Sequence, residues 1–240
     1  MKRKRIALEV IATTAEDARI AEAAGADRIE LICAQGEGGL TPSLGMVEQI
    51  VAQLTIPIHV MIRPHSRNFT YSQDDLDMML RDVRYVARSG ATALVLGVLD
   101  GHARIDEHAL QRIIDAAQQQ QSAIQITFHR AFDETTDLHQ SIHTLGQYPL
   151  ITRILTSGGQ PSVLEAVDEF PQLIRLADQH SLSLIAGAGL TLETLGDFVR
   201  RTGTREIHLG SAVRQQGNIL FPLDADRIRQ ARHILDACVE

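Results

Sequence analysis

Lysine is almost missing from this sequence. Only Lys2 and Lys4 occur, and the other 21 of the 23 basic residues are arginines. A guanidinium group keeps its charge and cannot serve as the amine of a Schiff base. The scarcity of lysine therefore argues against aldolase or pyridoxal-phosphate chemistry that depends on this side chain.

Cysteine and long apolar runs are also scarce. The two cysteines, Cys33 and Cys238, are too few and too far apart to suggest a disulfide framework or a zinc site. No run approaches the roughly 18 apolar residues that cross a bilayer. Glu9 interrupts the apolar stretch that follows the basic start at residues 2–5, so we predict no export signal. We expect a cytoplasmic protein that does not bind membranes.

Positive charge is in deficit, since 30 acidic residues outnumber 23 basic ones and leave a formal net charge of −7. A protein that binds nucleic acid in general needs a basic face to neutralise phosphates. We therefore expect no nucleic-acid partner.

What the sequence does contain is an alternation of β-prone runs and amphipathic helical stretches that occurs eight times. Glycines such as Gly25, Gly90 and Gly203 follow helical stretches, where glycine can take the left-handed conformation that ends a helix. Eight βα units of about 30 residues without a linker predict a single-domain (β/α)8 TIM-type barrel over residues 1–240. The expected strands are residues 6–11, 28–32, 58–62, 93–99, 123–128, 153–156, 183–186 and 206–209.

In such barrels the active site forms at the carboxyl ends of the strands. Four of these ends carry carboxylates: Glu9, Glu30, Asp100 and Asp133. Like charges that converge in a pocket need a cation, a metal ion or a shared proton to offset them. The group therefore predicts proton transfer or a divalent-metal site. The alternative is a buried structural network in which the carboxylates pair with Arg63 and Arg130.

Residues 127–133, Thr-Phe-His-Arg-Ala-Phe-Asp, form the densest polar group at an expected strand end. His129, Arg130 and Asp133 should lie close together there, because the strand ends and a helical stretch begins near Leu138. This arrangement predicts a functional role for His129, as a proton carrier, beside the charged pair.

Glycine-rich segments at residues 187–189 and 210–212 follow the last two expected strands. Backbone N–H groups of these loops commonly hold phosphate in barrels. We expect a phosphate or carboxylate group to bind there, with Ser157 and His208 at neighbouring strand ends. Glycine also serves tight βα turns, so the pattern leaves that second use open.

Five blocks of the sequence together resemble the CutC copper-homeostasis family along nearly the whole chain. The resemblance implies a barrel of this kind, a cytoplasmic location, an association with copper and a homo-oligomer. The blocks are residues 26–31 (ADRIEL), 37–43 (EGGLTPS), 61–64 (MIRP), 127–133 (TFHRAFD) and 153–158 (RILTSG).

The sequence departs from the family pattern at two cysteine positions. Ile11 stands where many members have a cysteine after the first strand's glutamate, and Ile32 stands where a second cysteine usually follows Glu-Leu. Cys33 comes one residue later, and a shift of one residue turns a strand side chain to the opposite face. Because Cu(I) prefers thiolate and thioether ligands, Cys33 is the one candidate copper ligand at the predicted mouth.

Two functions follow, one from the resemblance and one from the residues. The first is copper homeostasis with copper binding at Cys33. The second is an enzyme without Schiff-base chemistry, a lyase, isomerase or hydrolase, that acts on a small anionic or phosphorylated metabolite by acid/base or divalent-metal chemistry. It needs no nucleotide cofactor. A regulatory barrel that binds a metabolite without converting it is a third possibility.

For the enzyme, each residue at the mouth has an expected role. The acid/base or metal-binding groups are Glu9, Glu30 and Asp133, with His129 as proton carrier. The substrate-binding residues are Arg63, Arg130, Ser157, Gly187, Gly189 and His208.

Overall fold

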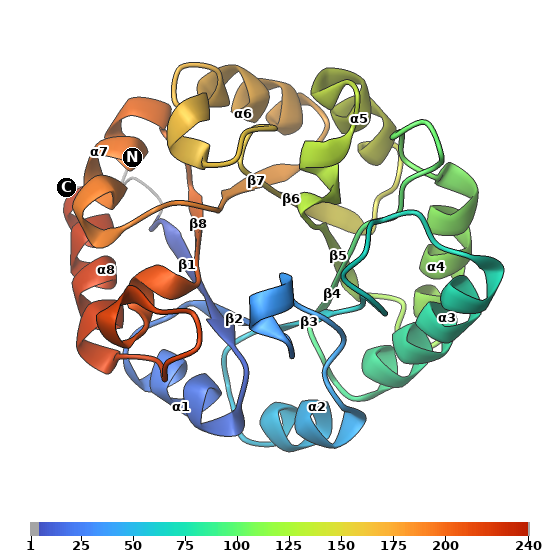
Figure 1. The fold of residues 1–240 in the computed structure, drawn as a ribbon, viewed down its shortest axis with the longest axis horizontal. Helices are drawn as coiled ribbons and strands as arrows, with labels where there is room; N and C mark the ends of the chain where they lie inside the picture. Colours follow the sequence, from blue (N-terminus) through green and yellow to red (C-terminus); the bar gives the residue numbers. More distant parts are fainter. Residues whose placement is uncertain (1–4, 240) are drawn as a thin grey trace.

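The computed structural model describes residues 5–239 as a closed barrel of eight parallel strands inside a ring of eight helices (Figure 1). Each strand pairs with its neighbours in chain order, and the last strand closes the ring against the first. The predicted (β/α)8 TIM-type barrel is therefore confirmed.

The strands and helices alternate along the chain without exception. The strands are β1 (Ala7–Ala12), β2 (Arg28–Leu31), β3 (Ile58–Met61), β4 (Ala93–Leu96), β5 (Gln125–Phe128), β6 (Ile151–Thr156), β7 (Ser183–Ala186) and β8 (Glu206–Leu209). The helices are α1 (Ala15–Ala23), α2 (Leu44–Val51), α3 (Gln73–Arg88), α4 (Glu107–Gln118), α5 (Leu138–Leu145), α6 (Phe170–Gln179), α7 (Leu192–Thr202) and α8 (Ala225–Ala237).

The strand ends differ from the expected ones by at most three residues. The largest difference is at β4, which stops at Leu96, because the chain beyond it leaves the barrel and Leu99 forms an isolated bridge with Ile105. Gly90 and Gly203 take positive φ angles of 93° and 70° directly behind α3 and α7. The left-handed glycine conformation that the sequence predicted behind these two helices is therefore present.

Alternate residues of a strand face the surrounding helices or the barrel axis. Along β1, Leu8 and Val10 belong to the large apolar layer between the strands and the helices. The apolar cluster inside the barrel is small and consists of Ile32, Met61 and Val95, with Ile11 packed against it. Branched apolar residues fill the interior of most such barrels, so this interior is unusually polar.

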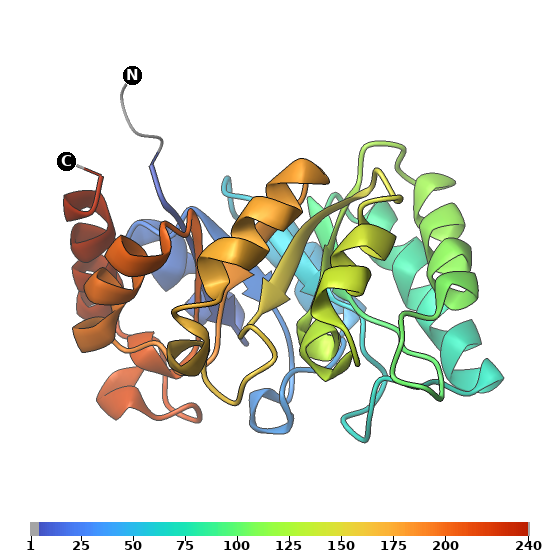
Figure 2. The same cartoon turned by 90° about the horizontal axis from the view of Figure 1, so that it is seen from above.

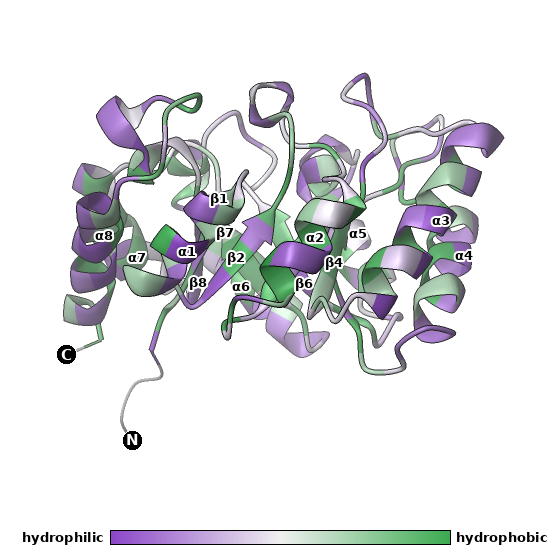
Figure 3. Ribbon diagram, turned by 90° about the horizontal axis from the view of Figure 1, so that it is seen from below, coloured by the Kyte–Doolittle hydropathy of each residue, from purple (hydrophilic) through white to green (hydrophobic). Residues whose placement is uncertain are grey.

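The loops that follow the strands project at one end of the barrel, and the described ends of the chain lie at the other (Figure 2). Figure 3 shows many hydrophilic residues on the projecting loops and hydrophobic ones along the strands beneath them. Among residues 5–239, no helix combines the length and the apolar character that a membrane crossing requires.

A buried ion pair fastens the seam where the barrel closes. Asp17 at the start of α1 lies 3.2 Å from Arg214, which follows β8, and both side chains are almost fully buried. Asp17 also accepts hydrogen bonds from Thr13 and from the backbone N–H of Leu223. The beginning and the end of the chain are therefore joined by charge as well as by the β1–β8 ladder.

Removing one partner of this pair should destabilise the fold. Asp17→Ala leaves the Arg214 guanidinium buried without a counter-charge, which costs on the order of 3–5 kcal/mol of unfolding free energy. Urea denaturation followed by circular dichroism measures the loss. The matched control is Asp168→Ala, because Asp168 pairs with Arg201 while 97% of its side chain is exposed. Equal stability of the two variants would contradict the seam's role.

Candidate functional site

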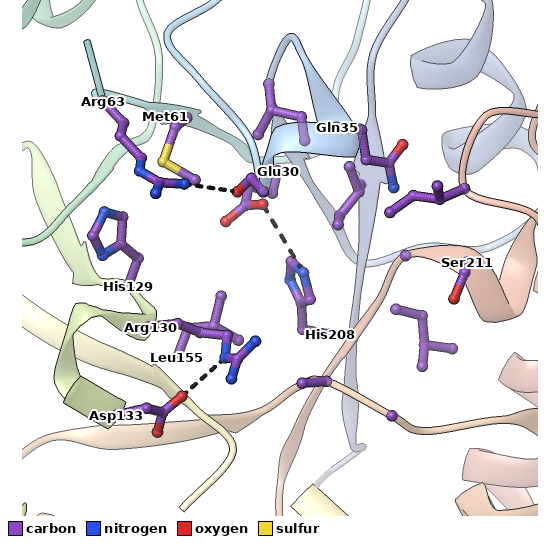
Figure 4. A pocket seen from close by; sticks show the side chains of 18 of the residues that line it. Glu30, Gln35, Met61, Arg63, His129, Arg130, Asp133, Leu155, His208 and Ser211 are labelled. Atoms are coloured by element: carbon purple, nitrogen blue, oxygen red, sulfur yellow. Dashed lines mark hydrogen bonds and ion pairs between the residues drawn. The ribbon is translucent and has the colours of Figure 1, made fainter. Parts of the chain in front are cut away.

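A cavity of about 370 Å³ opens at the carboxyl ends of the strands (Figure 4). Residues of β1, β2, β3, β6 and β8 and of the loops behind β2, β3, β5 and β7 line it. The predicted site residues on its wall are Glu30, Arg63, His129, Arg130, Asp133, Gly189 and His208. The structure thus brings together most of the residues that the sequence placed at the mouth.

Glu9 lies beneath this cavity, in the barrel interior, and is not part of its wall. One carboxylate oxygen is 2.7 Å from Nδ1 of His208, and the other accepts a 2.5 Å hydrogen bond from Nε of Arg28. Burial alone raises the pKa of Glu9, but Arg28 and the hydrogen bond to His208 outweigh it and hold that pKa well below its usual range. Glu9 is therefore a fixed negative charge that orients His208.

Glu30 is the carboxylate that faces the cavity. Its nearest charged neighbour is Nε2 of His208 at 3.9 Å, and its Oε1 atom has no hydrogen-bond partner among the described residues (Figure 4). Burial raises the pKa of Glu30 to about 7, against the opposing charge of His208. A carboxyl group that titrates near neutrality can both accept and return a proton.

His208 sits between the two carboxylates. Burial lowers its pKa, but the charges of Glu30 and Glu9 outweigh that effect, so the pKa of His208 lies above its ordinary value. Glu9 therefore holds the His208 ring from below, and Glu30 lies beside the ring on the cavity side. The two groups that face the cavity can share one proton.

His129 corrects one sequence-based expectation. Its Nδ1 accepts a 3.2 Å hydrogen bond from the backbone N–H of Ala131, which leaves the ring proton on Nε2. Burial and the charges of Arg63 and Arg130 lower the pKa of His129 to about 3. The ring is neutral at physiological pH, so His129 is a hydrogen-bond donor and not the proton carrier that we expected.

The glycine that makes room for His129 was not singled out from the sequence. A Cβ atom at Gly97 would stand 2.5 Å from Nδ1 of His129 and 2.7 Å from Cβ of Ala131. Any larger residue at this position would push the imidazole out of place. The Nε2 atom of His129 has no hydrogen-bond partner among the described residues, which leaves its proton for a ligand.

Arg63 supplies positive charge that no carboxylate neutralises. Its guanidinium donates to the carbonyl oxygens of Gly38, Gly39 and Ser66 at 3.3 Å, and it lies over the ring of Phe69. Within residues 5–239 no acidic group comes within 4.0 Å of it. The structural network that we weighed as an alternative therefore does not include Arg63, and a buried cation of this kind favours an anionic ligand.

Asp133 and Arg130 do form a structural pair. Nε of Arg130 lies 2.9 Å from Asp133, whose carboxylate also accepts hydrogen bonds from the hydroxyl of Thr156 and the backbone N–H groups of Ser157 and Gly159. With these acceptor positions occupied, Asp133 positions the loop behind β6. Both carboxylate oxygens of Asp133 already accept hydrogen bonds, which leaves no free lone pair for the acid/base role that we expected.

Ser157 and Gly187 are not on the cavity wall, which corrects their assignment as substrate-binding residues. The hydroxyl of Ser157 is engaged by Asp133 and by the carbonyl oxygen of Gln160. A Cβ at Gly187 would stand 2.8 Å from Leu155, so this glycine allows close packing. Gly189 does line the cavity, with a φ angle of 84° and no room for a side chain beside Ser162.

Cys33 also lies off the cavity wall. Its Sγ is 3.1 Å from the carbonyl oxygen of Thr41, and burial raises the pKa of the thiol. Ile32, the residue before it, lines the cavity. Asp100 is a further correction, since it closes a local turn with Arg104 and does not face the cavity.

Gln35 is a cavity residue that sequence reasoning missed. It belongs to the short 3-10 turn Gln35–Glu37, which lies over the barrel opening in Figure 1. The side chain is 7% exposed, and neither its amide oxygen nor its amide nitrogen has a partner among the described residues. A buried amide without partners is costly, so a polar ligand group is its natural complement. No local sequence pattern marks this glutamine.

Three groups in the interior offer donor atoms close enough to hold a metal ion. One atom each of Glu9, Glu30 and His208 lies within 4.8 Å of the others. The set contains two oxygens and one nitrogen and no sulfur. Arg28 already pairs with Glu9 in this set, so a cation there would have to share the carboxylate with a guanidinium.

The chain resembles known proteins over most of its length. The family model described as the CutC family matches residues 6–213. A CutC family protein of Klebsiella pneumoniae subsp. pneumoniae is 39% identical over 201 residues, which cover 84% of this chain and 78% of the relative. A second one, from another Klebsiella pneumoniae strain, is 38% identical over the same length.

Solved structures of other proteins are also similar to this chain. A CutC protein from Streptococcus agalactiae has 30% sequence identity and a TM-score of 0.78, covering 85% of this chain and 97% of that one. Phosphoribosyl anthranilate isomerase from Thermococcus kodakaraensis has 16% identity and a TM-score of 0.62, covering 96% and 98% of the two chains, and shows the barrel fold alone. By sequence and by fold, the chain belongs to the CutC family, which is named for copper homeostasis.

Proposed function

We propose that this protein is an enzyme that moves a proton on a small anionic metabolite bound in the cavity at the barrel mouth. One observation carries the proposal: Glu30 faces the cavity with an unpartnered oxygen, beside His208 and with a pKa of about 7. Groups that can exchange protons at neutral pH are suited to general acid/base catalysis.

Two neighbouring residues support this chemistry. The neutral His129 keeps its Nε2 proton for a ligand oxygen, and Arg63 contributes uncompensated positive charge. Preorganised donors of this kind stabilise the negative charge that develops on an oxygen when a proton leaves the adjacent carbon. Among the expected reaction classes, an isomerase or lyase that begins with proton abstraction fits these roles best.

Each residue then has a stated part in the reaction. Glu30 removes the proton, and His208 shares it while Glu9 holds the imidazole in place. His129 donates to the oxygen on which charge develops, and Arg63 attracts the anionic group of the substrate. Gln35 has a free donor and a free acceptor for a hydroxyl or amide of the substrate.

The residues do not fit a Cu(I) site. The thiol of Cys33 lies off the cavity wall and contacts a backbone carbonyl. Among the described residues that line the cavity, the thioether of Met61 is the one sulfur ligand for Cu(I). The oxygen and nitrogen atoms of Glu9, Glu30 and His208 suit harder cations better. We propose that the link between this protein and copper homeostasis does not run through a thiolate copper site in the barrel. The family resemblance still implies a cytoplasmic homo-oligomer.

The enzyme proposal can be tested before the substrate is known. Mixtures of small keto acids, hydroxy acids and sugar phosphates are incubated with the protein in D2O, and proton NMR records the loss of C–H signals. Glu30→Gln should slow deuterium incorporation by about 10²–10⁴-fold because the base is lost. Glu16→Gln, on the exposed face of α1, is the matched control and should retain the wild-type rate. Equal exchange by wild type and Glu30→Gln would contradict the proposal, as would no exchange in any mixture.

The pH dependence of the exchange reports the state of Glu30. The proton is accepted by the ionised carboxylate, so the rate should rise as pH increases through the region near 7, where Glu30 ionises. A free glutamate would give its rise near pH 4.3 instead. Exchange rates measured between pH 5 and 9, on a substrate identified by the D2O experiment, distinguish a rise near pH 7 from one near pH 4.3. A flat profile from pH 6 to 8 would assign the base to another group.

Copper binding gives a separate prediction. Titration with Cu(I) in competition with a chelator should show equally weak binding by the wild type and by Cys33→Ser, because the thiol is not directed at the cavity. Cys238→Ser serves as the second thiol control. Tight binding that Cys33→Ser abolishes would restore copper binding as a direct function.

A further inference from the structure

A second cavity, of about 400 Å³, lies at the opposite end of the barrel, where the strands begin. Residues at the starts of β1, β2, β7 and β8 line it. Its charged residues are four arginines and two acids: Arg5, Arg28, Arg153, Arg205, Asp178 and Glu206. Arginines thus outnumber acids on the wall, and Asp27 and Glu9, which do not line the cavity, pair with Arg5 and Arg28.

The two inner arginines converge on one carboxylate. Nη1 of Arg28 lies 2.6 Å from Oε2 of Glu206, and Nε of Arg153 lies 3.3 Å from the same atom. Arg153 is held further by Gln125, whose side-chain oxygen accepts a 2.6 Å hydrogen bond from Nη1. Glu206 therefore fixes two guanidinium groups side by side, and Glu9 is the second carboxylate that pairs with Arg28.

Arg28 has a donor left over. Its side chain is 6% exposed, Nε is used by Glu9 and Nη1 by Glu206, and Nη2 has no hydrogen-bond partner among the described residues. Buried guanidinium groups normally have their donors satisfied. A purely structural ion network explains the bonds to Glu9 and Glu206, but it explains neither this unpartnered donor nor the cavity that Arg28 lines.

We infer that the amino-end cavity binds a dianionic phosphate group, held by Arg28 and Arg153 from inside the barrel and by Arg205 at the rim. Four guanidinium groups around one cavity can donate to such a group in addition to the carboxylate with which each of them pairs. Arginine is suited to this ligand because its planar fork of donors fits phosphate oxygens in pairs. This site is separate from the mouth cavity, whose wall shares none of these residues.

The site also touches the interior of the barrel. Arg28 bonds to Glu9, and Glu9 bonds to His208 below the mouth cavity. A phosphate group that draws on the charge of Arg28 weakens its hold on Glu9. The two ends of the barrel are thereby linked through two side chains.

Inorganic phosphate is the probe, titrated into the full-length protein in a phosphate-free buffer and followed by calorimetry. Arg153→Gln should weaken phosphate binding by about tenfold or more, since a hydrogen bond to a charged group contributes roughly 1.5–3 kcal/mol. Arg205→Gln should weaken it in the same direction. Arg63→Gln, at the mouth, and Arg201→Gln, on the exposed face of α7, should leave this binding event unchanged.

Several outcomes would overturn the inference. These are an absence of phosphate binding, unchanged affinity in both Arg153→Gln and Arg205→Gln, and a loss of binding confined to Arg63→Gln, which would place the anion at the mouth. If Arg153→Gln does not fold, Arg205→Gln still decides, because the Arg205 side chain is 56% exposed and its ion-pair partner within residues 5–239 is the half-exposed Asp178. The result does not depend on the proposed enzyme activity.

Discussion

The barrel interior depends on the ionic and hydrogen-bond contacts of one buried carboxylate, that of Glu9. It lies 1% exposed between Arg28, His59 and His208, and a bare charge at such a depth would be very costly. Strand register supplies the compensation, because Glu9 is paired with Arg28 of β2 on one side and with His208 of β8 on the other. The position of His208, and through it the surroundings of Glu30, follow from the need to neutralise this one group.

The fold was predictable because its signals are local and repeated. Apolar, β-branched runs of four to six residues alternate with amphipathic stretches, and each strand inferred from them is present. The carboxyl ends of parallel strands meet at one end of a barrel, so the wall positions of Glu30, Arg63, His129 and His208 were also predictable.

What could not be predicted is which partner each polar side chain takes. Asp133 and Asp100 both stand near strand ends, yet local hydrogen bonds engage one in a loop and the other in a turn. The neutral state of His129 depends on a single backbone N–H from Ala131, which no residue pattern reveals. Gln35 could not be predicted, because the feature that marks it is a buried side-chain amide without hydrogen-bond partners, and only the folded structure shows this.

The charged pairs of the interior connect the first strands of the barrel to the last one. Here Arg28 of β2 pairs with Glu206 of β8, and His208 of β8 lies beside both Glu9 of β1 and Glu30 of β2. Separating the first strands from the last would take Glu206 from Arg28 and His208 from both carboxylates, so we expect the first and last βα units to fold together and not independently.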